Sequence, residues 1–286
     1  MTLPARLLRK KEIFPKKDLG QNFLACEQTA NMIVERAKID KDDIVLEIGA
    51  GLGALTIEAA KRAKKIYAIE KDYRLIDLLE EEIFKSGQDN IEIINKDILK
   101  VDIEKIIGEP GKKLVIIGNL PYNISSQILF RLIEKRDLIN KAYLMFQLEL
   151  ANRITAMPGT KDYSRLSAVM QYCADVQPVA DIKPHLFFPK PKVQSRVVEI
   201  SFFDLEDYSY EKEKFLFTVI KAAFSKRRKT LKNSLAGEDL SINREDAEKI
   251  LTAAAIDPVR RGETVNVKEF VNLAQHAWNY LKEDKW

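Results

Sequence analysis

The feature that most limits the fold is a short apolar run followed directly by a glycine-rich turn. The run is Ile44–Ile48, and three glycines at positions 49, 51 and 53 precede a helical pattern that continues to Ala63. A strand, a glycine turn and a helix in this order form the first unit of a nucleotide-binding α/β fold. The glycines permit a tight turn and let a ligand approach the backbone closely.

The spacing of the glycines fits two kinds of ligand. Gly49, Gly51 and Ala54 satisfy the dinucleotide fingerprint in its G/A form. The same turn, read as three glycines at every second position with Glu47 two residues before the first, is common in enzymes that bind S-adenosylmethionine. That ligand has no pyrophosphate, so the turn needs only to cradle its methionine part and ribose. The turn alone leaves both ligands open.

Acidic residues end the next two expected strands. Glu70 closes the run that starts at Lys65, about 20 residues beyond the glycines, where a carboxylate suits a ribose diol. Asp97 closes the run that starts at Ile91 and could accept the amino group of an adenine. A solvated charge run at Glu70 and a turn or helix N-cap at Asp97 are the alternative interpretations.

A polar tetrapeptide ends the fourth expected strand. Asn119-Leu120-Pro121-Tyr122 follows the buried-strand pattern Leu114–Gly118 and precedes the helical pattern Ile124–Ile133. Open α/β folds bind ligands at this end of their strands. An Asn oxygen and a nearby carbonyl can accept both N–H bonds of an adenine amino group, Pro121 fixes the backbone, and Tyr122 offers a stacking face. A proline turn with a core tyrosine is the alternative.

The remaining pattern up to residue 204 is that of an α/β domain. Helices are expected over Glu27–Ala37, Tyr73–Lys85 and Glu149–Met157, and strands over Lys141–Gln147, Ala168–Val176 and Val193–Phe203. Alternating strands and helices that end in two neighbouring strands predict a mostly parallel sheet closed by an antiparallel pair.

A stiff loop precedes the last of these strands. Phe187 and Phe188 stand directly before two prolines that alternate with Lys190 and Lys192. Aromatic rings interleaved with cations suit an unstacked base and its phosphates. A core position is expected for at least one of the two phenylalanines.

The composition changes after Asp204. An acidic linker leads to helical patterns over Lys214–Phe224, Arg244–Ala255 and Val267–Leu281. Between the first two lies a basic run, which we expect to be an amphipathic helix with Leu231 and Leu235 inward and its cations outward: Lys226, Arg227, Arg228, Lys229 and Lys232. Such a surface suits phosphates, and a solvated face is the alternative.

Charge and cysteine content exclude several classes of protein. The net charge of +4 equals that of residues 1–24, where six cations and two acids predict either a frayed arm or a phosphate-contacting arm. Cys26 and Cys173 are far apart and the chain has two histidines, so we expect neither a disulfide framework nor a metal site. No apolar run has membrane-spanning or signal-peptide character. We therefore expect a cytoplasmic protein without membrane association.

With these motifs in order, the chain resembles the ribosomal RNA adenine dimethyltransferases, whose relatives include the erythromycin-resistance rRNA methylases. The matching stretches cover nearly the whole chain: D-L-G-Q-N-F-L, V-L-E-I-G-A-G-L-G-A-L-T, A-I-E-K-D, N-K-D-I-L, G-N-L-P-Y-N-I-S-S, F-F-P-K-P-K-V-Q-S and A-F-S-K-R-R-K-T-L-K-N-S-L. The family usually has Pro where Ala50 stands. The short spacing after the basic run is more typical of archaeal members.

The resemblance implies a fold and a reaction. Residues 25–204 would form a Rossmann-like, class I S-adenosylmethionine methyltransferase domain with a mostly parallel sheet of seven strands. Residues 1–24 would be a basic N-terminal arm and the start of the cofactor loop, and residues 205–286 a small helical rRNA-binding domain. The implied reaction moves methyl groups from S-adenosylmethionine to N6 of two adjacent adenosines near the 3′ end of small-subunit rRNA. We expect a monomer that acts on the rRNA or on a pre-assembled small subunit.

The resemblance also implies the site residues. The cofactor would contact Gln21, Asn22, Leu24, Gly49, Gly51, Glu70, Lys71, Asp97, Ile98 and Asn119. The target adenine would contact Asn119, Leu120, Pro121 and Tyr122, with Phe187 rather than Phe188 on its opposite face. Lys190 and Lys192 would join the basic run as RNA contacts. Because a sulfonium methyl is already electrophilic, alignment and hydrogen bonding can suffice without a titrating base.

Two other functions compete with this one. An NAD(P)-dependent oxidoreductase would use Gly49, Gly51, Ala54 and Glu70, but it leaves the tetrapeptide, the Phe-Pro loop and the basic run without a role. A non-catalytic rRNA-binding assembly factor would keep the fold and transfer no methyl group.

Overall fold

The structure is a computed structural model that describes residues 2–16, 18–107, 112–204, 209–226 and 228–283. The chain divides into two compact units. The first comprises Met1–Ala151 and Val176–Phe202, and the second comprises Asn152–Asp175 and Phe203–Trp286. The chain passes from the first unit to the second for the last time between residues 202 and 203, close to the boundary expected after residue 204. Residues 152–175 also belong to the second, helical unit.

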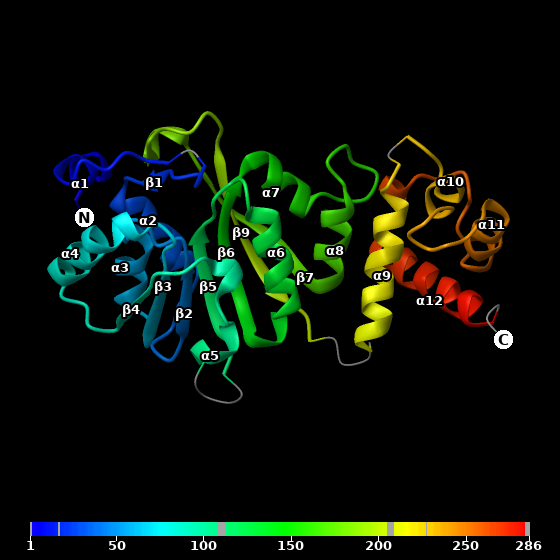
Figure 1. The fold of residues 1–286 in the computed structure, drawn as a ribbon, viewed down its shortest axis with the longest axis horizontal. Helices are drawn as coiled ribbons and strands as arrows, with labels where there is room; N and C mark the ends of the chain where they lie inside the picture. Colours follow the sequence, from blue (N-terminus) through cyan, green and yellow to red (C-terminus); the bar gives the residue numbers. More distant parts are fainter. Residues whose placement is uncertain (1, 17, 108–111, 205–208, 227, 284–286) are drawn as a thin grey trace. The chain divides into compact units, whose positions relative to one another are not determined.

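A seven-stranded sheet with the order β4-β3-β2-β5-β6-β9-β7 forms the centre of the fold (Figure 1). Neighbouring strands are parallel from β4 to β6, and β9 runs antiparallel to β6. The mostly parallel sheet predicted from the sequence is confirmed. Its strands are β2 (Ile44–Ile48), β3 (Lys65–Ile69), β4 (Ile91–Ile94), β5 (Leu114–Asn119), β6 (Ile139–Gln147), β7 (Ala174–Ile182) and β9 (Ser195–Phe202).

The central strands are buried along nearly their whole length, and apart from Glu47 and the terminal Asn119 their residues are apolar or glycine. All five residues of β2 and the first five of β5 are buried. Such continuous apolar runs are typical of parallel strands between helical layers. The helices of this part are α2 (Glu27–Arg36), α3 (Ala54–Ala60), α4 (Ile76–Ser86), α5 (Ile103–Ile107) and α6 (Ser125–Glu134), and α7 (Leu148–Thr155) begins here and ends in the second unit.

The N-terminal segment contains a packed helix, α1 (Pro4–Lys10), rather than a frayed arm. Leu7 and Leu8 are buried in an apolar cluster that includes Leu75 and Leu78. On the outside of this contact, Lys10 forms an ion pair of 2.7 Å with Glu81 of α4. Buried leucines thus attach α1 to the body of the unit, while its cations stay exposed.

The strand predicted over residues 168–176 is wrong for most of its length. Residues 165–173 form helix α8 (Arg165–Cys173), and β7 begins only at Ala174. Ser164 precedes the helix, and its backbone N–H donates to Ser167 Oγ at 2.9 Å in a capping box. This arrangement starts a helix. The Val, Tyr and Cys content of the segment gave the misleading strand signal.

The second unit is helical, as expected, with α8, α9 (Tyr210–Ala223), α10 (Leu231–Leu235), α11 (Arg244–Ala253) and α12 (Val267–Glu283). Edge-to-face packing of Phe215 on Trp278, with 5.2 Å between ring centroids, joins α9 to α12. Tyr172 packs similarly on Phe217 and joins α8 to α9.

The basic run does not form the expected amphipathic helix. Its described residues before Leu231 lie in turns and bends. This segment lies between the end of α9 at Ala223 and Thr230, the N-cap of the short α10. Leu231 and Leu235 are buried as predicted. Arg227 lies outside the described residues.

The packing of α1 can be tested by truncating its buried face. We expect Leu8→Ala to lower the free energy of unfolding by about 2–5 kcal/mol, because it leaves a cavity in the cluster. Urea denaturation followed by circular dichroism measures the change. The control is Leu3→Ala, since Leu3 is 62% exposed. Equal midpoints for the two variants would show that α1 does not pack in solution.

Candidate active site

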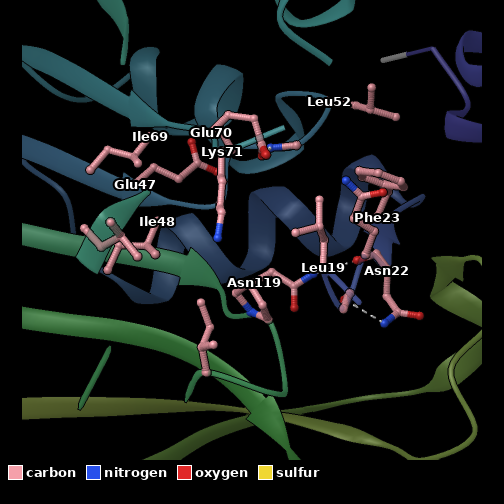
Figure 2. Close-up of a pocket in the computed structure, with 18 of the residues that line it drawn as sticks. Leu19, Asn22, Phe23, Glu47, Ile48, Leu52, Ile69, Glu70, Lys71 and Asn119 are labelled. Atoms are coloured by element: carbon pink, nitrogen blue, oxygen red, sulfur yellow. Dashed lines mark hydrogen bonds between the residues drawn. The ribbon is translucent and has the colours of Figure 1, made fainter. Parts of the chain in front are cut away.

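A pocket opens at the carboxyl ends of the central strands (Figure 2). It is lined by the loop of residues 18–24, by residues 47–55 around the glycine turn, and by the ends of β3, β4 and β5. In Figure 2, Glu70 and Lys71 lie above Asn119, with Asn22 and Phe23 to one side. All ten residues expected to contact a cofactor line this one pocket: Gln21, Asn22, Leu24, Gly49, Gly51, Glu70, Lys71, Asp97, Ile98 and Asn119.

The glycine turn brings its backbone to the pocket surface. The N–H groups of Gly49 and Ala50 donate to the carbonyl of Ile69 at 2.9 and 3.0 Å, which ties the turn to the end of β3. Gly51 has a φ of +58°, and a Cβ there would lie 3.1 Å from the Phe23 ring. The positive φ favours glycine at this position, and a larger residue would also force the Phe23 ring to shift.

Glu70 is a buried carboxylate held by backbone donors. Its Oε2 accepts from the N–H of Gly51 at 2.8 Å, and its Oε1 accepts from the N–H of Asp72 at 2.7 Å. Burial raises the pKa of Glu70. Since a carboxylate offers about four acceptor positions, these two bonds fix its orientation and leave capacity for hydroxyl donors.

Glu47 is a second buried acid in the pocket, noted in the sequence only as part of the glycine motif. It is 1% exposed and accepts a hydrogen bond from the Thr56 hydroxyl. Burial raises the pKa of Glu47 to about 7, and the negative charge of Glu70 acts in the same direction. Two acids therefore line the pocket in an environment that disfavours their charge unless a cation is bound.

Asp97 has the N-cap role that was considered for it, and its second oxygen is paired with a lysine. Its Oδ1 accepts from the N–H of Leu99 at 3.0 Å, so it caps a short 3-10 turn. Its Oδ2 forms an ion pair of 2.9 Å with Lys71, and the hydrogen bond from Lys71 lowers the pKa of Asp97. An adenine amino group approaching Asp97 would meet Lys71 beside it.

The loop of residues 18–24 is fastened to the tetrapeptide. Asn119 Nδ2 donates to the carbonyl of Asn22 at 2.7 Å, and Asn123 Nδ2 donates to the carbonyl of Asp18 at 2.8 Å. A Cβ on Gly20, whose φ is +61°, would come within 3.2 Å of the Tyr122 nitrogen. The loop of residues 18–24 and the tetrapeptide therefore pack directly against each other.

These bonds decide which end of the Asn119 amide is an acceptor for a ligand. A carbonyl can only accept, so the amide nitrogen faces Asn22 and Oδ1 is the remaining end. The Pro121 oxygen is already occupied, since it accepts from Ser125 Oγ at 2.7 Å. Asn119 Oδ1 is therefore the acceptor end of a side chain that lines the pocket.

A second set of bonds ties the same loop to the end of β3. Gln21 Nε2 donates to Asp72 Oδ2 at 2.8 Å, and the guanidinium of Arg74 binds both oxygens of Asp72. The Arg74 hydrogen bonds lower the pKa of Asp72 to about 2. Because the N–H of Asp72 donates to Glu70, Asp72 links the loop to the acid at the glycine turn.

The aromatic residues expected to contact the target base differ in their contacts and exposure. The Tyr122 hydroxyl lies 3.1 Å from Ser195 Oγ, and burial raises the pKa of Tyr122. Phe187 is only 4% exposed and belongs to the apolar core of the unit, whereas Phe188 is 37% exposed. In this conformation Phe187 has no free ring face, so its expected contact with the base would require the loop to move.

Comparison with known proteins identifies the family. The family model for ribosomal RNA adenine dimethylase matches residues 14–273. The chain belongs to the ribosomal RNA adenine dimethylase family. It is 56% identical over 279 residues to the ribosomal RNA small subunit methyltransferase A of Desulforapulum autotrophicum, covering 98% of each chain. It is 38% identical to the protein of the same name from Alkaliphilus oremlandii, covering 94% of each.

Solved structures give the same family relationship. The dimethyladenosine transferase from Plasmodium falciparum is 27% identical, with a TM-score of 0.75 over 90% of this chain and 98% of that one. The 23S rRNA methyltransferase ErmE is also 27% identical, with a TM-score of 0.69 over 90% and 99%. The most similar curated relatives are bacterial, so the archaeal expectation finds no support. Membership of this family sets aside the oxidoreductase interpretation of the glycine turn.

The basic residues of this dimethylase lie on exposed segments of each unit. In the first unit Lys190 and Lys192 are exposed. In the second, Lys226, Arg228 and Lys229 are exposed, while Lys232 forms an ion pair with Glu248. Arg261 is an exposed cation that the sequence analysis missed. It lies in the loop whose Pro258 and Arg260 carbonyls accept from the backbone of α10, and only this tertiary contact relates it to the basic run.

Two further features bear on the sequence analysis, namely metal sites and membrane-spanning helices. Among the described residues no group of three or more His, Cys, Asp or Glu side chains is arranged to hold a metal ion. Within the same residues no helix has the length and apolar character needed to cross a membrane.

The buried Glu47 predicts a pH dependence of stability. Its folded-state pKa of about 7 lies above the ordinary value of 4.5, so the folded state holds this proton more tightly than the unfolded state. The contribution of Glu47 to stability therefore falls as pH rises from 4.5 to 7. As pH rises from 4.5 to 7, we expect the free energy of unfolding of Glu47→Gln to increase by about 2–3 kcal/mol relative to that of the parent protein. Urea denaturation without cofactor, repeated across this range, measures it, and a constant difference between the two proteins would contradict the assignment.

Proposed function

We propose that this enzyme transfers methyl groups from S-adenosylmethionine to N6 of two adjacent adenosines near the 3′ end of small-subunit rRNA. The observation that carries the proposal is the orientation of Asn119. Its amide nitrogen donates to the Asn22 carbonyl, which leaves Oδ1 as the acceptor end of a side chain that lines the pocket. An oxygen fixed in this way accepts an N–H of the adenine amino group and aims the nitrogen lone pair at the cofactor.

The pocket suits S-adenosylmethionine in shape and in charge. The Gly51 backbone allows close approach, Glu70 is set to accept hydroxyl hydrogens of a ribose, and Asp97 or its partner Lys71 meets the adenine edge. Glu47 and Glu70 provide negative charge for a cationic ligand. When bound, the cofactor supplies an electrophilic methyl group on a sulfonium.

The protein contributes alignment and a hydrogen bond rather than a base. The pocket-lining residues include neither a histidine nor a cysteine. Asn119 Oδ1 withdraws the amino group from conjugation with the ring by accepting one of its hydrogens. Tyr122, held by Ser195, stacks on the base and limits its tilt. The proton of the methylated nitrogen can leave to water after transfer.

The exposed cations supply the affinity for RNA. Because each phosphate contact releases counterions, the exposed cations Lys226, Arg228 and Lys229 and the lysines at 190 and 192 favour a polyanion. The target base must leave its stack to enter a pocket of this kind. The same substrate implies a cytoplasmic enzyme of ribosome biogenesis, and we propose that it acts as a monomer on rRNA or on a partly assembled small subunit.

The direct test is incubation of unmethylated small subunits with labelled S-adenosylmethionine, followed by mapping of the labelled nucleotides. Label on two neighbouring adenosines near the 3′ end is expected. Binding of the subunit without any label would instead support a non-catalytic assembly factor. Stronger thermal stabilisation of the protein by NADH than by S-adenosylmethionine would contradict the cofactor assignment.

The role of Asn119 predicts a separation of binding from chemistry. We expect Asn119→Ala to lower kcat by at least about 100-fold, the usual effect of removing one oriented donor or acceptor at a reacting group. Cofactor affinity, measured by calorimetry, should fall by a much smaller factor than kcat, because the glycine turn, Glu70 and Asp97 still line the pocket. Asn123→Ala is the matched control, since it removes the neighbouring amide contact to the same loop. A kcat for Asn119→Ala no lower than that of the control would defeat the mechanism.

The cation clusters predict a change in salt dependence. We expect Lys226→Ala, Arg228→Ala and Lys229→Ala each to reduce the slope of log affinity against log salt by about one. Filter binding of rRNA at several salt concentrations gives the slope. Lys249→Ala and Lys268→Ala, exposed lysines on α11 and α12, serve as controls. A slope that is the same in all five variants would mean that the basic run does not contact RNA.

A further inference from the structure

The exposed ring of Phe188 has no role in the function proposed above. Phe187 and Phe188 form the short strand β8 (Phe187–Phe188), and their exposed fractions are 4% and 37%. A large apolar side chain held in a strand and open to solvent is a candidate contact surface.

Strand pairing fixes where this ring lies. β8 runs antiparallel to β1 (Phe23–Leu24), with Phe188 opposite Phe23 and Phe187 opposite Leu24. Directly opposed residues of an antiparallel pair point to the same face. Phe188 therefore shares a face with Phe23, and Phe187 shares the other face with Leu24.

Phe23 connects this face to the pocket. It lines the pocket and packs against Gly51 of the glycine turn. Opposed Cβ atoms are about 4.5–5.5 Å apart, so the Phe188 ring is anchored one side chain away from the pocket wall. The hydrogen bond from Ala25 N–H to the Leu186 carbonyl, at 2.8 Å, extends the ladder and holds the ring in this place.

The surroundings of Phe188 favour a nucleotide over an apolar protein partner. Exposed lysines stand on both sides of it in the chain, at positions 183, 190 and 192. An aromatic face with cations beside it binds an unstacked base by its ring and the adjoining phosphates by charge.

A base that leaves its stack deprives its neighbour of a stacking partner. We propose that Phe188 replaces that partner: it is a stacking subsite for the nucleotide next to the adenosine in the pocket. This inference rests on the proposed function, because that function supplies a neighbouring purine.

The test compares RNA affinity among variants of the exposed ring. The probe is a synthetic fragment of the rRNA 3′ end that carries the two adenosines, and binding is measured by fluorescence anisotropy. We expect Phe188→Ala to weaken binding at least fivefold, as for loss of one base–aromatic stack, and Phe188→Trp to retain it. Phe84→Ala is the matched control, since Phe84 is an 87% exposed phenylalanine on α4. Thermal stabilisation by S-adenosylmethionine should be the same in all four proteins.

A second binding experiment changes the RNA instead of the protein. An abasic nucleotide at the position next to the target should weaken binding to the parent protein by the same factor and should cost Phe188→Ala nothing more. Additive losses, parental affinity in Phe188→Ala, or loss of cofactor stabilisation in that variant would each overturn the subsite. Absence of methyl transfer by a parent protein that binds the fragment would overturn the proposed function, and the binding comparison would still decide the subsite.

Discussion

The site depends on one hydrogen bond between two segments that are far apart in the sequence. Asn119 Nδ2 donates to the carbonyl of Asn22, and this bond both seats the loop of residues 18–24 and fixes which atom of the amide faces the ligand. An amide free to rotate would present a donor to the target amino group half of the time, and a donor there repels it. The close approach of Gly20 to the backbone of Tyr122 keeps the two segments in register.

The same loop is bound at its other side to the acids of the pocket. Gln21 donates to Asp72, and the backbone N–H of Asp72 donates to Glu70. A shift of Glu70 on ligand binding would therefore also move the loop that orients Asn119. These hydrogen bonds, continued through the peptide bond between Gln21 and Asn22, connect Glu70 at the glycine turn to Asn119 at the end of β5. It gives a physical route by which occupancy of the cofactor site could improve the geometry for the second substrate.

Much of this could be predicted from the sequence because the signals are local. Continuous apolar runs marked β2 and β5, and glycine spacing marked the turn, since each depends on residues within one element. The helix α8 was missed because its start is set by a Ser164–Ser167 pair, whereas its apolar residues suggest a strand. The burial of Phe187 and the exposure of Phe188 follow from pairing with a segment more than 160 positions away, which local pattern cannot supply.

The two substrates differ in charge, and the protein separates the residues that meet them. Glu47 and Glu70 are buried in the pocket, where burial raises the pKa of each and a cationic ligand would relieve the unfavourable charge. The exposed lysines and arginines lie on surface segments, where a polyanion would contact them without desolvation. The separation is not complete, because Lys71 and Lys96 also line the pocket, and Lys71 is paired with Asp97. The pocket therefore combines buried acids at the glycine turn with a neutral amide, Asn119, at the end of β5.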